Sequence, residues 1–221
     1  MHKIALVLAC SLLLTLPPAW GAPKDADANI KPAVLTTREQ RKLNSKLSEV
    51  TKDDEIKEAI RIMNDCISSR YSYNAILGNN LTKKPVKITF KNLAEINPNY
   101  ADYDALGMKN KGRLYIFINQ KHKGAPPEAL ASLLSHEAMH QDEFNSVNEE
   151  TYAWSLEAAV WTEFLKTKPD LRNKTEYSLV NRLNTLNSLF VNANYTDKYI
   201  RKVIKNHQGY KDLPLRSVGF D

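Results

Sequence analysis

Cysteine is scarce in this sequence, and its scarcity limits how the fold can be stabilised. Of the two cysteines in 221 residues, Cys10 lies in an apolar stretch at the N-terminus and Cys66 lies in the body of the chain. Without the N-terminal stretch, Cys66 has no partner for an intramolecular disulfide. Stability must then come from a hydrophobic core or from a bound metal. We expect Cys66 itself to be a small, buried side chain on a helix.

Long apolar runs are missing outside the N-terminus. Lys3 precedes an almost wholly apolar stretch over residues 4–16, and Pro17-Pro18 and the small residues of Ala19-Trp20-Gly21 follow it. This order predicts a signal peptide at residues 1–21. The stretch is short for a membrane span, and no later segment approaches the roughly 18 apolar residues that a span needs. We therefore expect an exported protein, periplasmic or secreted, with no stable membrane span.

A strong excess of one charge is missing too. Lys and Arg number 31 against 25 Asp and Glu, a net charge of +6, and removal of residues 1–21 would reduce it to +5. The basic residues are spread along the chain, and no cluster of them indicates a nucleic-acid or membrane site. We expect no nucleic-acid partner. Internal repeats and low-complexity tracts are absent, and about 200 residues suit one domain.

Pro, Gly and polar residues divide the chain into segments. After the signal peptide, the predicted segments are a flexible leader at 22–35, N-terminal helices at 36–80, a core at 81–168, and C-terminal helices with a tail at 169–221. Within the N-terminal segment, Thr36 or Thr37 can cap a helix over 39–50, and apolar residues at helical spacing predict a second helix over about 53–77.

The core segment contains the strand patterns. Alternating residues predict a strand over 86–90 and a hairpin whose second strand runs from Arg113 to Asn119. A helix follows, with Pro127 near its first turn. Further helical patterns cover about 147–168, 174–192 and 197–206. The sequence therefore predicts an α+β fold, predominantly helical, with a small, mostly antiparallel sheet before the helix that starts near Pro127.

The residues His136-Glu137-Ala138-Met139-His140 form an H-E-x-x-H motif in a run of good helix formers. Residues four apart share one face of a helix, so His136 and His140 could offer two imidazoles to one metal ion. Glu137 could take a proton from water that the metal activates. This combination is typical of zinc hydrolases. We expect His136 and His140 as metal ligands and Glu137 as the general base.

A zinc ion held by two histidines needs a third protein ligand. Ser146 and Glu149 fit a capping box, in which Glu149 would reach back to the start of its helix. Glu150 would then be free to bind the metal from the first turns of that helix. We expect Glu150 to be the third ligand. The alternatives are Glu149, Glu143 and Glu157.

The motif followed by Glu150-Thr151-Tyr152-Ala153 resembles the gluzincin metallopeptidases, the thermolysin-like group. In that group a Glu from the following helix joins the two motif histidines. The resemblance covers about residues 84–165. The Gly and third His of metzincins are absent, as are the Gly-Cys segment of peptide deformylases and the Gly-Thr-x-Asp of aspzincins. The resemblance implies a zincin-like core with one Zn²⁺ per chain, held by His136, His140 and Glu150.

The function that this resemblance implies is that of an exported zinc metallopeptidase, a hydrolase that cuts a peptide or protein substrate, which could be associated with the cell envelope. One alternative is a catalytically silent zincin-fold binding protein of the cell envelope. Another is a helical binding module with an accidental motif and no metal. The strand Arg113–Asn119 is a candidate edge for an extended substrate. Candidate oxyanion donors are His122, Tyr152, Tyr195, Tyr199, His207 and Tyr210.

Overall fold

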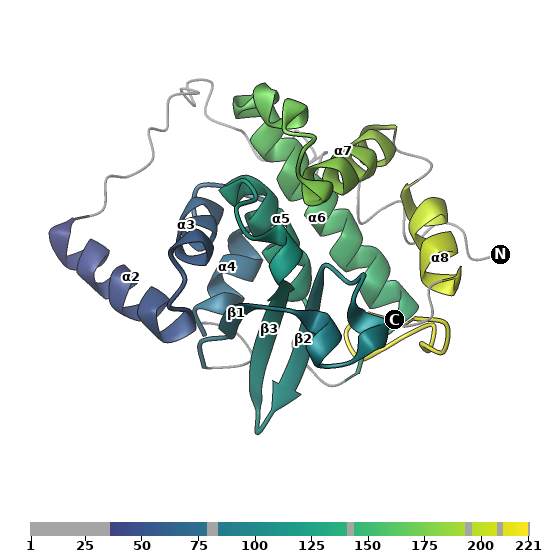
Figure 1. Ribbon diagram of the computed structural model, residues 1–221, viewed down its shortest axis with the longest axis horizontal. Coiled ribbons are helices and arrows are strands. Elements are labelled where there is room, and N and C mark those ends of the chain that lie inside the picture. Colours follow the sequence, from purple (N-terminus) through teal and green to yellow (C-terminus); the bar gives the residue numbers. More distant parts are fainter. Residues whose placement is uncertain (1–35, 79–83, 141–143, 193–195, 207–209, 221) are drawn as a thin grey trace, which may run out of the picture. The chain divides into compact units, whose positions relative to one another are not determined.

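A computed structural model gives the architecture of this chain and describes residues 36–78, 84–140, 144–192, 196–206 and 210–220, without the side chains of 196 and 197. The predicted signal peptide (1–21) and leader (22–35) lie outside these residues. The helices are α2 (Thr37–Val50), α3 (Asp54–Met63), α4 (Arg70–Ile76), α5 (Pro127–Glu137), α6 (Val147–Thr167), α7 (Ser178–Val191) and α8 (Thr196–Asn206) (Figure 1). The strands are β1 (Lys87–Lys91), β2 (Ala105–Asn110) and β3 (Arg113–Asn119). Short 3-10 turns are Leu93–Glu95, Pro98–Tyr100, Gln120–His122 and Pro169–Asn173.

The first described helix, α2, begins with the capping box that its sequence predicts. The hydroxyl of Thr36 accepts a hydrogen bond from the N–H of Glu39, and the Glu39 carboxylate accepts one from the N–H of Thr36. Two backbone N–H donors at the start of the helix, which would otherwise be unpaired, are thus satisfied locally. The cap predicted at Thr36 or Thr37 is confirmed at Thr36.

The single helix predicted over 53–77 is wrong, because the chain turns between α3 and α4. The carboxylate of Glu163 on α6 accepts hydrogen bonds from the backbone N–H groups of Ile67 and Ser68, at 2.7 and 3.0 Å. These amides therefore bond to a distant helix, and Ile67 is 74% exposed instead of continuing the apolar face. Cys66 is buried as expected, but it lies in this turn, where burial raises the pKa of its thiol to about 11.

The sheet is mixed and has the order β1-β3-β2. Strand β3 pairs in parallel with β1 on one side and antiparallel with β2 on the other. A two-residue turn at Lys111-Gly112, with φ values of 49° and 71°, closes the predicted hairpin. The fold class is confirmed, with the difference that the sheet is mixed instead of mostly antiparallel. The prediction that Arg113–Asn119 is an edge strand is wrong, because β1 pairs with its second side.

Helix α5 lies at the centre of the fold. Figure 1 shows it running between α3 and α6, and it packs on both helices as well as on β2. Every residue from Glu128 to Glu137 is buried, which is the pattern of a helix covered on all sides. Leu130 and Leu134 join Ile116 of β3 and Trp161 of α6 in one hydrophobic core. The end of α5 is therefore held firmly by its surroundings.

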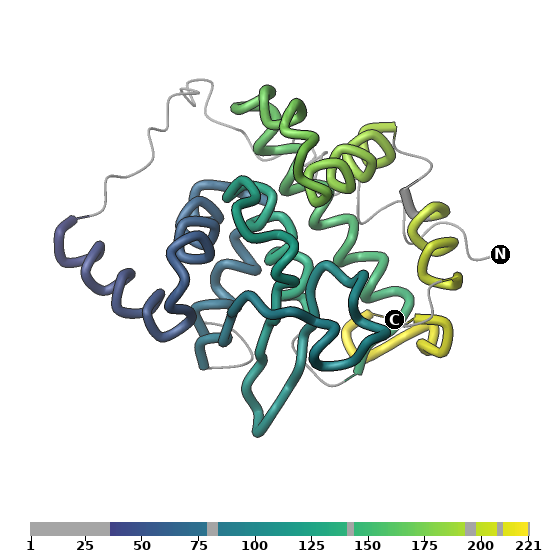
Figure 2. Tube along the Cα trace, in the orientation of Figure 1, coloured from purple at the N-terminus to yellow at the C-terminus, as the bar shows by residue number. Residues whose placement is uncertain are grey.

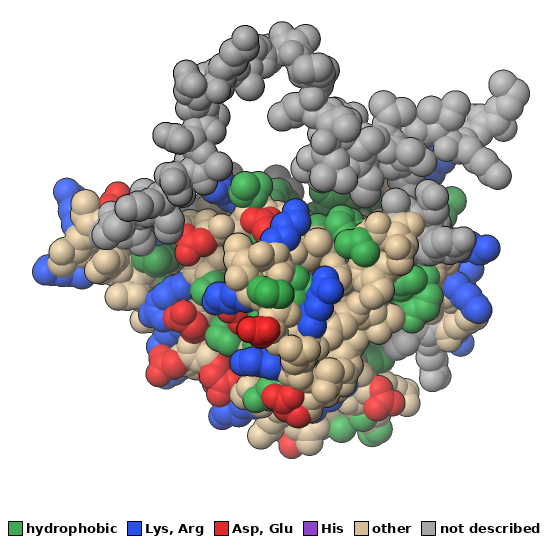
Figure 3. All heavy atoms as spheres, turned by 90° about the horizontal axis from the view of Figure 1, so that it is seen from above, with side chains coloured by type: hydrophobic (Ala, Val, Ile, Leu, Met, Phe, Trp, Pro, Cys, Tyr) green, Lys and Arg blue, Asp and Glu red, His purple; other side chains and the backbone are tan. Residues whose placement is uncertain are grey.

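The C-terminal part of the chain returns to the beginning of α6. Helices α7 and α8 pack on α6, and the trace in Figure 2 brings residues 210–220 beside its N-terminal end. Backbone N–H groups of Val147 and Asn148 donate to the carbonyls of Pro214 and Leu215, which confirms this placement. Acidic and basic side chains are interspersed on the face drawn in Figure 3. Among the described helices, none combines the length and apolar character needed to cross a bilayer.

Candidate metal centre

The H-E-x-x-H motif lies at the C-terminal end of α5. His136 and Glu137 are its last residues, and the backbone then tightens, with the N–H of Met139 donating to the carbonyl of His136 at 2.9 Å. The expectation that one regular helix carries both histidines is therefore wrong, since His140 follows the helix. The tight turn still brings the two rings together, with centroids 5.3 Å apart.

Glu150, in the first turns of α6, faces both histidines. Its Oε2 atom lies 3.5 Å from Nε2 of His136, and its Oε1 atom lies 3.5 Å from Nε2 of His140. One ligand atom from each of the three residues lies within 4.8 Å of the others, so the group could hold a metal ion. Ala153, one turn further along α6, is fully buried, and its small side chain leaves room for the two helices to approach.

The bonding of these residues supports a cation at this point. Within the described part of the chain, Oε2 of Glu150 is buried and accepts no hydrogen bond. A buried carboxylate oxygen without a partner is costly, and a metal ion between it and the two Nε2 atoms would remove that cost. Two imidazoles and a carboxylate are also a donor set that suits divalent transition metals.

The charges within the site also favour a bound cation. Burial alone lowers the pKa of His136, but the carboxylates of Glu150 and Glu157 outweigh it and raise that pKa to about 10. Burial raises the pKa of Glu150, whereas His136 and His140 lower it to about 2. The surroundings thus favour a positive charge between the carboxylates and the rings, whether a proton or a metal cation supplies it.

Each imidazole also has a carboxylate near its other nitrogen. Nδ1 of His140 lies 3.0 Å from Oε1 of Glu149, and Nδ1 of His136 lies 3.4 Å from Oε2 of Glu157. Such outer carboxylates fix the orientation and tautomer of metal-binding histidines. The predicted capping box at Ser146 is therefore only half formed. Ser146 accepts from the N–H of Glu149, but the Glu149 carboxylate turns to His140, and Asn145 accepts the N–H of Ser146.

Glu157 is neutralised by Arg182 of α7. The guanidinium donates to both oxygens of the Glu157 carboxylate, and its Nε atom lies 2.8 Å from Oδ2 of Asp104. Asp104 also lies 2.6 Å from Nε2 of His122 and 3.2 Å from Nζ of Lys121. Burial would raise the pKa of Asp104, but His122, Arg182 and Lys121 hold it well below its usual range. A chain of alternating charges thus runs from the buried His136, through the partly buried Asp104, to the exposed Lys121.

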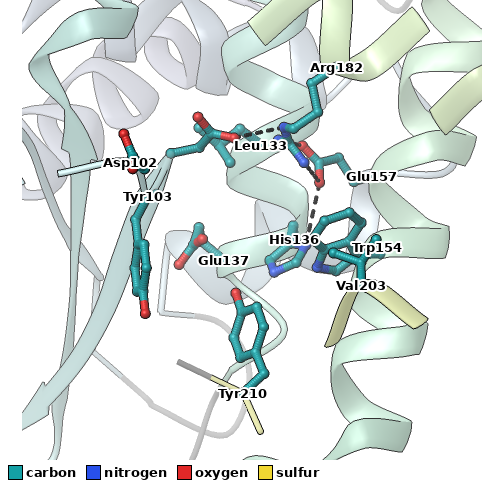
Figure 4. A pocket seen from close by; sticks show the side chains of 12 residues that line it. Asp102, Tyr103, Leu133, His136, Glu137, Trp154, Glu157, Arg182, Val203 and Tyr210 are labelled. Atoms are coloured by element: carbon teal, nitrogen blue, oxygen red, sulfur yellow. Dashed lines mark hydrogen bonds and ion pairs between the residues drawn. The ribbon is translucent and has the colours of Figure 1, made fainter. Parts of the chain in front are cut away.

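A cavity of about 120 Å³ opens beside the motif. Figure 4 shows Glu137 and His136 on its wall, with Tyr103, Tyr210 and Trp154 around them. Burial raises the pKa of Glu137, and the neighbouring carboxylates add to this effect against the two histidines. A carboxylate with a raised pKa is a better proton acceptor near neutral pH. The Glu137 carboxylate therefore lies where it could act as a general base on a small molecule, or on one residue of a peptide, bound in the cavity.

The structure brings together His136, Glu137, His140 and Glu150 from the predicted set. Glu149 and Glu157 face the outer nitrogens of the imidazoles. Among the oxyanion candidates, Tyr210 lines the cavity, while His122 is bonded to Asp104. Glu143, Tyr195 and His207 lie outside the described residues. Sequence reasoning did not single out Arg182 or Asp104, because no local pattern marks a residue whose partners are 17 or more positions away.

Comparison with known proteins identifies no relative: no protein-family model, no curated protein and no solved structure matches this chain. The site is therefore interpreted from its own geometry and chemistry.

The network at Asp104 predicts a pH-dependent contribution to stability. Asp104→Asn should lower the free energy of unfolding by about 2 to 3 kcal/mol at pH 7, because a partly buried carboxylate that pairs with the buried His122 and with Arg182 is lost. The folded-state pKa of Asp104 lies below its unfolded value. The stabilisation is thus present above that unfolded value of about 3.9 and is lost as pH falls toward the folded pKa. Urea unfolding at pH 7 and pH 3 measures both effects.

The control for that experiment is Asp102→Asn, which removes an exposed carboxylate two residues away. Its effect should stay within about 0.5 kcal/mol at both pH values. A stability difference between Asp104→Asn and the native protein that does not narrow at low pH would contradict the role given to Asp104.

The geometry also ranks the acidic residues around the histidines. Glu150→Gln removes the carboxylate that faces both Nε2 atoms, whereas Glu149→Gln removes only an outer partner. In titrations with Zn²⁺ against a competing chelator, Glu149→Gln should weaken binding by about tenfold to a hundredfold, and Glu150→Gln by more. Glu176→Gln, an exposed site, is the control and should bind as the native protein does. A larger loss in Glu149→Gln than in Glu150→Gln would make Glu149 the ligand.

Proposed function

We propose that this chain is an exported zinc metallopeptidase. The observation that carries the proposal is the convergence of His136, His140 and Glu150 with Glu137 on the wall of an adjoining cavity. Export rests on the signal-peptide pattern of residues 1–21 alone. Zinc is proposed because two imidazoles and one carboxylate, with a further position left for water or substrate, are the donor set of catalytic zinc sites.

The proposed chemistry assigns a separate task to each residue. A zinc ion at His136, His140 and Glu150 would lower the pKa of water and polarise the carbonyl of the bond to be cut. Glu137, which is not in the ligand group, accepts the proton that the attacking water loses and returns it to the leaving amine. Tyr210 lines the same cavity and is proposed to donate a hydrogen bond to the oxygen of the former carbonyl.

The substrate proposal is an extended peptide alongside β2. In the described chain β2 pairs with β3 alone, so its other edge is available for a further strand. Gly107 of β2 lies next to the base, since a Cβ atom at that position would stand 3.5 Å from Oε2 of Glu137. A peptide added to this edge by main-chain hydrogen bonds would bring a carbonyl close to Glu137 and the histidines. This edge replaces Arg113–Asn119 as the proposed substrate strand.

The first test separates metal binding from hydrolysis. Glu137→Gln should keep zinc at the native stoichiometry and lose about a hundredfold to ten-thousandfold in kcat, because the proton acceptor is removed and the ligands remain. The measurement is metal content by elemental analysis together with cleavage of a peptide library. Native-like turnover by a zinc-loaded Glu137→Gln protein would overturn the role of Glu137. A native protein that holds zinc but cuts no peptide would favour the silent binding protein of the cell envelope.

The second test removes the metal. Exhaustive dialysis against a chelator should abolish peptide cleavage, and stoichiometric Zn²⁺ should restore it, because the zinc ion is the proposed Lewis acid of the site. Mg²⁺ should not restore it, since that ion prefers oxygen ligands over imidazoles. Cleavage that persists in a protein shown to be free of metal would end the metallopeptidase proposal.

A further inference from the structure

The amino end of α6 is completed by residues that lie some 70 positions later in the chain. Helix N-termini have unpaired N–H groups, and those of Val147 and Asn148 donate to the carbonyls of Pro214 and Leu215 at 2.9 and 3.1 Å. The Asn148 side-chain amide also donates to the carbonyl of Phe220 at 3.1 Å. Residues 213–220, here called the C-terminal segment, therefore cap the helix that carries Glu149 and Glu150.

Apolar contacts fix the C-terminal segment in the same place. Leu213, together with Tyr210 just before it, packs against a small core of Val147, Ile200 and Ile204. The ring of Phe220 stacks at a tilt on Tyr152 of α6, with centroids 5.8 Å apart. Contacts at both ends of the segment thus hold its middle, and Ser217 with it, against the start of α6.

Ser217 connects the C-terminal segment to the metal centre. Its Oγ atom lies 3.0 Å from Oε2 of Glu149 and 2.9 Å from Oγ of Ser146. The carboxylate accepts, so the Ser217 proton satisfies Glu149, and the Ser146 hydroxyl can donate to Ser217 while it accepts from the N–H of Glu149. The other oxygen of Glu149 lies 3.0 Å from Nδ1 of His140. An unbroken chain of hydrogen bonds therefore runs from Ser217 to a candidate metal ligand.

His140 is the ligand that depends most on this support. His136 is held by the backbone of α5, whereas His140 follows the end of that helix. The partner that orients its ring is Glu149, and Glu149 is itself oriented by Ser217 and Ser146. Residues that orient a metal-binding histidine act on metal affinity without touching the metal.

We propose that the C-terminal segment is a working part of the metal centre, in which Ser217 is a positioning residue for His140 by way of Glu149. The inference rests on the proposed metal site. Docking of the segment should then favour metal binding, and metal binding should favour docking by the same factor, because coupling between two sites is reciprocal. Loss of the segment, for instance by proteolysis, would lower metal affinity while His136, His140 and Glu150 stay intact.

The experiment compares four variants with the native protein by Zn²⁺ titration against a chelator and by urea unfolding without metal. Ser217→Ala should bind zinc about tenfold more weakly, the lower end of what loss of a histidine's outer partner costs, and a chain ending at Leu213 by about tenfold or more. Ser217→Thr keeps the hydroxyl and should restore most of the affinity. Ser188→Ala is the control, since that serine is exposed and its hydroxyl, among the described residues, bonds only within its own helix, to the carbonyl of Asn184.

Amide hydrogen exchange of the native protein measures the docking of the C-terminal segment without any variant. Exchange at Val147 and Asn148, whose N–H groups bond to the C-terminal segment, should slow when Zn²⁺ is added, by about the factor that truncation costs in affinity. Native affinity in Ser217→Ala, or exchange at these two amides that zinc leaves unchanged, would overturn the inference while leaving the metallopeptidase proposal intact. A native protein that binds no zinc would overturn both.

Discussion

Burial of three carboxylates on one helix is the constraint on which the rest of this structure depends. Glu149, Glu150 and Glu157 of α6 are each almost fully covered, and like charges at such depth repel strongly unless cations or hydrogen-bond donors compensate them. The compensation differs for each. Arg182 neutralises Glu157 from α7, the C-terminal segment and His140 satisfy Glu149, and Glu150 faces the two histidines with one oxygen unbonded. A metal ion bound there would compensate the charge of Glu150 and contact its unbonded oxygen.

The surrounding fold can be understood as the support for this arrangement. Helix α5 is covered on all sides, which fixes His136 and Glu137 through backbone and packing. The sheet contributes the opposite wall, where Gly107 of β2 lies close to the carboxylate of Glu137. Helix α7 and the C-terminal segment contribute charges and hydrogen bonds from the other side. Each half of the chain thus supplies contacts that the motif by itself lacks, which explains how so short a motif is held in place.

Much of this could be anticipated from local pattern. The capping box at Thr36, the Lys111-Gly112 hairpin and the helix beginning at Val147 are each indicated by residues within four positions of one another, and all three are present. The errors share a cause as well. The predicted helix over 53–77 is interrupted where Glu163 accepts hydrogen bonds from the amides of Ile67 and Ser68. Strand β3 lies in the middle of the sheet because β1 pairs with it at residues 28 positions away. Distant partners leave no periodic signal in either segment.

The sequence by itself determined which functional groups are available: two imidazoles, a carboxylate between them in the chain and an acidic residue on the next helix, at spacings that a helix end and the turn after it can bring together. Only the tertiary structure decided how the neighbouring acids divide their tasks. Glu149 and Glu150 are adjacent in sequence and equal in character, yet one turns to the Nδ1 side of His140 and the other to the Nε2 atoms of both histidines. The physical reason is the packing of α5 on α6, since adjacent residues on a helix point about 100° apart and the contact selects between them.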